Sequence, residues 1–86
     1  TNDENTKKIK ESIKKAVLEY DSLLSIHDFR MVDGAEKINL IFDVVVPNEV
    51  KKQDSDIKEE INKICKKLDS RYRAVITIDR DYISAS

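Results

Sequence analysis

The stretch SIHDFRMVDGAEKINLIFDVVV, residues 25–46, decides the fold of this chain. It holds two β-prone runs separated by Asp33-Gly34-Ala35-Glu36, and Asp-Gly between two apolar runs is a strong hairpin signal. Gly34 is the only glycine in the sequence, so we expect it to supply the positive φ that a primed turn requires. The second arm, 38–46, is the most β-prone segment of the chain. Pro47 ends it, because proline cannot donate to a sheet ladder.

The composition indicates one small globular domain. Of the 86 residues, 40% are hydrophobic and 38% are charged, a balance that is typical of a folded chain. Sixteen basic and seventeen acidic residues nearly cancel, which argues against nucleic acid as a partner. Cys65 is the only cysteine, so an internal disulfide and a Cys-rich zinc site are excluded, and a reducing compartment fits. No run approaches the ~20 apolar residues that span a bilayer.

The expected domain organisation follows from the pattern of apolar residues. We expect a single domain over 1–86, with a frayed N-terminus at 1–5, a globular part at 6–80 and a tail at 81–86. Because the sequence lacks an initiator Met, we expect it to be a piece of a longer protein.

Helical periodicity predicts a first helix that begins near Asn5 or Thr6 and ends near Tyr20. Its apolar stripe is Ile9, Ile13, Val17 and Tyr20, with Ala16 beside it. Lysines dominate the other face. They indicate a solvated basic face, and binding of anionic lipid headgroups stays open as the alternative.

A second helix is predicted after the polar stretch 48–53. Asp54, Ser55 or Asp56 can cap it, and its stripe is Ile57, Ile61, Ile64, Cys65 and Leu68. The run 74–79 then predicts a third strand. The order α-β-β-α-β, with a crossover that places the last two strands parallel, predicts an α+β two-layer sandwich. This is a truncated ferredoxin-like fold, with a three-stranded mixed sheet and both helices on one of its faces.

The second strand carries apolar residues on both faces. Ile38, Leu40, Phe42, Val44 and Val46 alternate with Asn39, Ile41, Asp43 and Val45. One face must meet the helices, and nothing in this chain remains to cover the other. We therefore expect a two-fold homodimer that uses the uncovered face or an edge of the sheet.

These elements resemble the C-terminal cytoplasmic domain of the cation diffusion facilitator (cation efflux) transporters. The resemblance is carried by Val17-Leu18-Glu19-Tyr20-Asp21, by Ser25-Ile26-His27-Asp28-Phe29-Arg30, and by the strand pair, helix and Ala74-Val75-Ile76-Thr77-Ile78-Asp79 that follow. It implies an αββαβ ferredoxin-like domain that follows a six-helix membrane domain, at the cytoplasmic face of the cell membrane. It also implies a V-shaped homodimer in which divalent metal draws the two copies together.

In zinc-binding members the resemblance implies a regulatory site whose five positions are His27, Phe42, Ser55, Thr77 and Asp79 in this chain. We expect His27 and Asp79 to be remnant candidates for metal ligands, and Phe42, Ser55 and Thr77 to lie at a packed interface between two copies. Zinc requires about four nitrogen, sulfur or oxygen ligands, so we expect no cofactor beyond weakly bound zinc or manganese. We also expect a dimer that is closed regardless of metal, with Phe42 supplying buried contact area.

Several residues have alternative interpretations. Carboxylates at Asp28, Asp43 or Asp79 could build an oxygen-rich site that manganese or magnesium prefers. Asp28 and Arg30, two residues apart, predict an exposed ion pair. Cys65 in an apolar stripe indicates a small buried side chain rather than a reactive thiol.

Two hypotheses of function remain from the sequence. The first is a non-catalytic dimerisation and regulatory domain of a divalent-cation efflux transporter, whose partners are a second copy of itself and the transmembrane domain of the same chain. The second is a free-standing ferredoxin-like small-ligand sensor or interaction module. An enzyme is not expected, because no nucleophile–base pair and no Gly-rich phosphate loop are visible.

Overall fold

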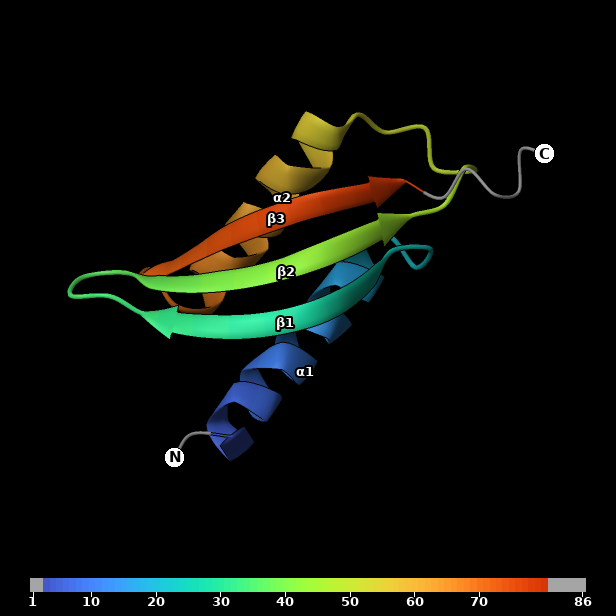
Figure 1. Cartoon of the computed structure of the whole chain (residues 1–86). Coiled ribbons are helices and arrows are strands. Elements are labelled where there is room, and N and C mark those ends of the chain that lie inside the picture. Colours follow the sequence, from blue (N-terminus) through green and yellow to red (C-terminus); the bar gives the residue numbers. More distant parts are fainter. Residues whose placement is uncertain (1–2, 81–86) are drawn as a thin grey trace.

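The computed structural model describes residues 3–80, so the predicted tail at 81–86 lies outside the described residues. Its five elements are α1 (Asp3–Tyr20), β1 (Ser25–Asp33), β2 (Ile38–Val46), α2 (Asp54–Leu68) and β3 (Tyr72–Arg80). The three strands form one sheet with both helices packed on the same face (Figure 1). The two-layer α+β class, the αββαβ order and the mixed sheet predicted from the sequence are therefore confirmed.

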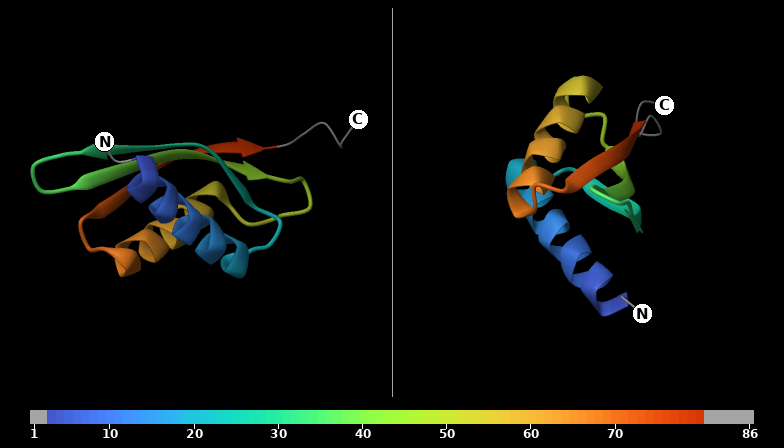
Figure 2. Two further views of the ribbon diagram at one scale, coloured as in Figure 1. Left: turned by 90° about the horizontal axis from the view of Figure 1, so that it is seen from below. Right: turned by 90° about the vertical axis from the view of Figure 1, so that its left-hand side faces the viewer.

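The strand order is β1-β2-β3, with β2 in the centre. β1 pairs antiparallel with β2, as a hairpin requires, and β3 pairs parallel with β2, as the helical crossover requires. In the left view of Figure 2 both helices lie below the sheet, and in the right view α1 runs obliquely past its edge. One face of the sheet is thus left without a covering layer.

The core lies between the sheet and the helices. Alternate residues of β2 enter it, and Phe42 and Leu40 are among its largest fully buried side chains. The stripes predicted on the two helices supply Ile13 and Val17 from α1, and Ile57, Ile61 and Cys65 from α2.

The start of each helix differs from the prediction. α1 begins at Asp3 rather than at Asn5 or Thr6, and Glu4 in its first turn suits the positive end of the helix dipole. α2 begins at Asp54 after Gln53, and no side chain of 54–56 caps it. Instead, the Asp54 carboxylate accepts a hydrogen bond from Arg80 Nε at 3.0 Å. This contact directs the Asp54 side chain away from the backbone N–H groups of the first helical turn.

The hairpin forms where predicted, but the reason for its glycine is different. The φ of Gly34 is not positive, so the turn is not of the primed type. The Gly34 N–H donates to the Lys37 carbonyl at 2.8 Å, and a Cβ on Gly34 would lie 2.8 Å from the same oxygen. Glycine is required there by close backbone approach rather than by conformation.

The positive φ in the described chain is at Asp28, with φ 56°. It lies in a β-bulge between His27, which pairs with Asp43, and Arg30, which pairs with Ile41. Asp28 and Phe29 together stand opposite the single residue Phe42, as in a bulge with one extra residue. The bulge leaves Phe29 pointing inward, where its ring stacks on Phe42 with centroids 5.7 Å apart.

Candidate functional site

The candidate functional site is the sheet face that the helices leave uncovered, which we call the open face. Side chains alternate between the two faces along each strand, so the register assigns its members. They are Ser25, His27, Arg30 and Val32 of β1, Asn39, Ile41, Asp43 and Val45 of β2, and Arg73, Val75, Thr77 and Asp79 of β3.

His27, Asp43 and Thr77 form one row across the open face. Asp43 is the register partner of both of the others, with His27 on one side and Thr77 on the other. Asp79 lies one row further along, beside Val45. The His27 ring is exposed and its Nε2 is hydrogen bonded to the Ser25 hydroxyl at 3.2 Å. The strands thus bring an imidazole and two carboxylates onto neighbouring positions of one surface.

Phe42 is placed differently from the expectation. It is 1% exposed and faces the helices, so its ring belongs to the core of this chain and has no free surface for a partner. The second-strand residue opposite His27 is Asp43, one position further along. The open face therefore holds His27, Asp43 and Asp79 as possible ligands, one more than the two remnant ligands expected from the sequence.

The donor set fits a divalent cation only in part. One imidazole and two carboxylates could contribute to a zinc or manganese site, but zinc needs about four ligands in tetrahedral reach. Within residues 3–80, no three His, Cys, Asp or Glu side chains are close enough together to hold a metal ion. A single chain therefore does not present a formed site, and further ligands would have to come from another molecule.

The remaining predicted site residues divide between the two layers. Thr77 is exposed on the open face, whereas Ser55 is exposed in the first turn of α2, in the opposite layer of the sandwich. Asp28 and Arg30 both line a shallow hollow beside the bulge, together with Phe29 and Asp43. The ion pair predicted between Asp28 and Arg30 is not among the ion pairs of the described residues.

Both edges of the sheet are altered in ways that hinder pairing with another strand. On the β3 edge, the Asn62 side chain of α2 is hydrogen bonded to both backbone groups of Ala74. It accepts from the N–H at 3.0 Å and donates to the carbonyl at 3.2 Å. Lys66 Nζ donates to the Tyr72 carbonyl at 3.0 Å. On the β1 edge, the bulge at Asp28 interrupts the regular ladder.

A clamp at one end of the sheet holds the segment between β2 and α2. Besides Asp54, the Arg80 guanidinium donates to the backbone carbonyl of Val50 at 2.8 Å and to that of Lys52. Lys52 Nζ pairs with the Asp21 carboxylate at 2.9 Å, and its hydrogen bond lowers the pKa of Asp21. These contacts are structural, since none of them reaches the open face.

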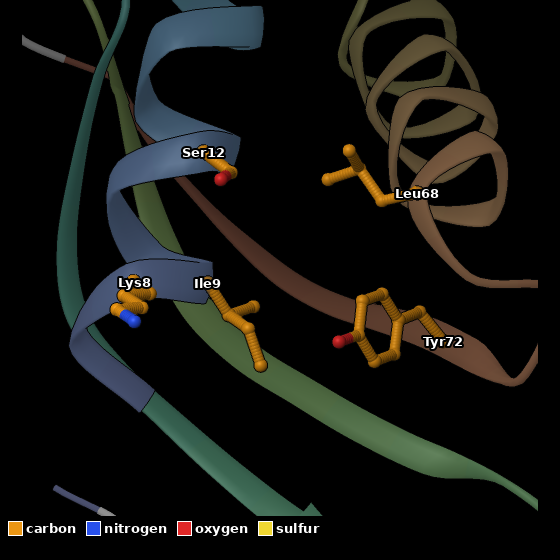
Figure 3. Close-up of a pocket in the computed structure, with 5 residues that line it drawn as sticks. All are labelled: Lys8, Ile9, Ser12, Leu68 and Tyr72. Carbon is orange, nitrogen blue, oxygen red and sulfur yellow. The ribbon is translucent and has the colours of Figure 1, made fainter. Parts of the chain in front are cut away.

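The helix layer carries a small hollow and a buried thiol. A small hollow between α1 and the end of α2 is lined by Lys8, Ile9, Ser12, Leu68 and Tyr72, with the Ile9, Leu68 and Tyr72 side chains directed toward one another (Figure 3). Cys65 is fully buried, and burial raises the pKa of its thiol to about 11. A neutral, inaccessible thiol is neither a nucleophile nor a metal ligand at neutral pH.

The fold defines the class of this protein as an αββαβ ferredoxin-like domain. It is similar to the C-terminal domain of the magnetosome protein MamB from Desulfamplus magnetovallimortis BW-1, with a TM-score of 0.70 at 19% identity, covering 86% of this chain and 94% of that one. It is also similar to the metal-bound C-terminal domain of the CzcD transporter from Thermotoga maritima, with a TM-score of 0.62 at 21% identity, covering 86% of each chain.

Both neighbours are C-terminal domains of cation diffusion facilitators, the family that the sequence resembles. At these identities the likeness establishes the shared fold. No protein-family model and no curated protein sequence matches the chain. In the described part of the chain, neither helix is both long and apolar enough to cross a membrane.

Proposed function

We propose that this chain is the C-terminal cytoplasmic domain of a cation diffusion facilitator, and that it acts without catalysis by pairing two transporter subunits. The sequence resemblance and the two structural neighbours support the family, and such transporter domains are not enzymes. The partners are a second copy of this domain and the transmembrane domain of the same protein. The domain would then work at the cytoplasmic face of the membrane.

The observation that carries this proposal is the open face itself. Val75 is 42% exposed and Val32 is 49% exposed, while Ile41, the register partner of Val75, is half-buried between the outer strands. An apolar patch in the middle of a sheet is an unusual feature for a solvated surface and is typical of an interface.

The state of the two edges favours the face over strand-to-strand pairing. The contacts of Asn62 and Lys66 occupy outward backbone groups of β3, and the bulge at Asp28 distorts β1. A second copy would therefore stack face to face in a two-fold arrangement, with the same patch used by both chains.

Metal has a secondary place in this proposal. A dimer brings two copies of His27, Asp43 and Asp79 near one another, so that weak zinc or manganese binding would require both chains. Apolar contact at Val75 and Ile41 replaces the role that the sequence had suggested for Phe42, since the Phe42 ring is buried in its own chain. We propose that the dimer forms without metal and that any cation affinity is weaker than micromolar.

Sedimentation of the purified chain at tens of micromolar tests this proposal. We expect a dimer, and we expect Val75→Asp to shift it to monomer because a charge would be buried at the interface. The matched control is Leu68→Asp, since Leu68 is 49% exposed but lies on α2, in the opposite layer. A monomeric wild-type chain, or equal effects of the two substitutions, would contradict the proposal.

The metal part is tested separately by calorimetry with zinc and manganese at neutral pH. We expect no binding tighter than micromolar, and we expect scattering curves in chelator and in excess zinc to superimpose. If zinc or manganese bound tightly and stoichiometrically, and His27→Ala abolished that binding, His27 and its neighbours on the open face would be a working metal site instead.

A further inference from the structure

The charges of this chain are unevenly distributed. Residues 7–15, KKIKESIKK, hold five lysines and one glutamate, a formal charge of +4 in a chain whose net charge is −1. The rest of the chain therefore carries −5. All five lysines lie on α1 and precede its last turn.

The structure directs this charge away from the core. Ile13 and Val17 form the buried side of α1, with 0% and 1% exposure, whereas Lys7, Lys8 and Lys15 are exposed on the outer side. None of the five lysines forms an ion pair with another described side chain. The N-terminal half of α1 also extends past the edge of the sheet, which leaves it accessible (Figure 2).

Two large aliphatic side chains at the end of α1 and just after it are exposed. Leu18 is 47% exposed and Leu23, just after the helix, is 52% exposed. Leu18 follows Lys14 by four residues and Lys15 by three, so these side chains share one side of the helix. We call the surface formed by Lys7, Lys8, Lys15 and Leu18 the basic face of α1; the exposed Glu11 lies among these lysines and offsets one of their charges.

We infer that the basic face of α1 binds a membrane surface that contains anionic lipids. Lysines are attracted to the negative surface potential, and aliphatic side chains beside them can enter the headgroup boundary, as in interfacial helices. The basic face has no arginine or aromatic side chain to read or stack on bases, so the pattern favours lipid over nucleic acid.

This inference goes beyond the proposed function and does not depend on dimer formation. α1 belongs to the helix layer, whereas the open face is on the other side of the sheet, so both surfaces can be occupied together. If the domain is attached to a membrane domain, as proposed above, the attachment would also raise the effective concentration of lipid at α1.

Flotation of the 86-residue chain with lipid vesicles tests the inference. We expect binding to phosphatidylcholine vesicles that contain about one third phosphatidylglycerol, none to phosphatidylcholine alone, and loss of binding in high salt. The combined change Lys7→Gln, Lys8→Gln and Lys15→Gln should weaken partitioning by about 100-fold, at about fivefold for each lysine. Leu18→Ser should weaken it by about tenfold.

The matched control is Lys58→Gln, Lys63→Gln and Lys67→Gln, which removes three exposed lysines from α2 and should change partitioning less than about threefold. Circular dichroism and sedimentation of each variant separate lipid binding from folding and from dimer formation. An equal loss of vesicle binding in the α2 variant would overturn the inference, because it would indicate that binding depends only on the net charge of the chain. Absence of wild-type binding to anionic vesicles, or tighter binding to a DNA duplex than to vesicles, would also overturn it.

Discussion

Replacing Asn62 by alanine removes the side chain that occupies the outward backbone groups of β3. Asn62 is half-buried, and it makes two hydrogen bonds with Ala74, at 3.0 and 3.2 Å. Each contributes about 1 kcal/mol net, which gives about 2 kcal/mol for the pair. Alanine is the better helix former by about 0.6 kcal/mol, so the expected loss in the free energy of unfolding is about 1.5 kcal/mol.

Urea unfolding followed by circular dichroism measures this loss directly. For a domain of this size, the same loss lowers the midpoint of thermal unfolding by about 6–12 °C. Lys63→Ala is the matched control, because Lys63 is the next residue on α2 and is exposed, and its effect should stay within about 0.5 kcal/mol.

The same substitution tests the role of the β3 edge. Without Asn62, the N–H and carbonyl of Ala74 are free to pair with a strand of another molecule, so we expect concentration-dependent aggregation that the Lys63 control does not show. An Asn62→Ala protein as stable and as soluble as the wild type would refute the view that α2 protects this edge.

Three further predictions concern the turn, the acid response and the thiol. Gly34→Ala and Gly34→Asn should both destabilise the hairpin by about 1–2 kcal/mol in urea unfolding, because any Cβ meets the Lys37 carbonyl; a tolerated asparagine would indicate a left-handed turn instead. Hydrogen bonds from Arg71 lower the pKa of Asp69 from 3.8 to about 2, so its stabilising effect is present above pH ~4 and disappears as the pH falls towards 2. The midpoints of Asp69→Asn and wild type should therefore converge on acidification. Cys65 should react with a thiol reagent only after unfolding in urea, and rapid reaction of the native protein would contradict its burial.

Local patterns in the sequence predicted the fold well because they agree with one another. The alternation along Ile38–Val46 set the inner and outer faces of β2. The predicted helical stripes supplied most of the facing layer, although Leu68, the last residue of the second stripe, is 49% exposed. A strongly β-prone segment and two amphipathic helices can bury their apolar surfaces together in only a few arrangements.

The site was predicted less well because the pairing of β1 with β2 is shifted by one residue, and no local sequence pattern indicates this shift. The bulge at Asp28 and Phe29 adds a residue to β1, so that His27 lies beside Asp43 on the open face rather than beside the buried Val44, its partner in an uninterrupted ladder. Such a bulge depends on the stacking of Phe29 on Phe42, which is a tertiary contact. The sequence likewise predicted the turn at Gly34 correctly, but not why glycine is needed there. The need comes from the close approach of the Lys37 carbonyl, which only the structure shows.

The most direct test of a dimer through the open face is the distance between identical spin labels in the two copies. Thr77→Cys places a label on the open face, and Lys63→Cys places one on an exposed position of α2, while buried Cys65 stays unlabelled. Stacked sheets lie about 10 Å apart, so two sandwiches joined by their open faces put the α2 labels on opposite outer surfaces, roughly 30 Å or more from each other. The account predicts a clearly shorter distance between labels at position 77 than between labels at position 63. The reverse order, or no intermolecular distance at either position, would contradict it.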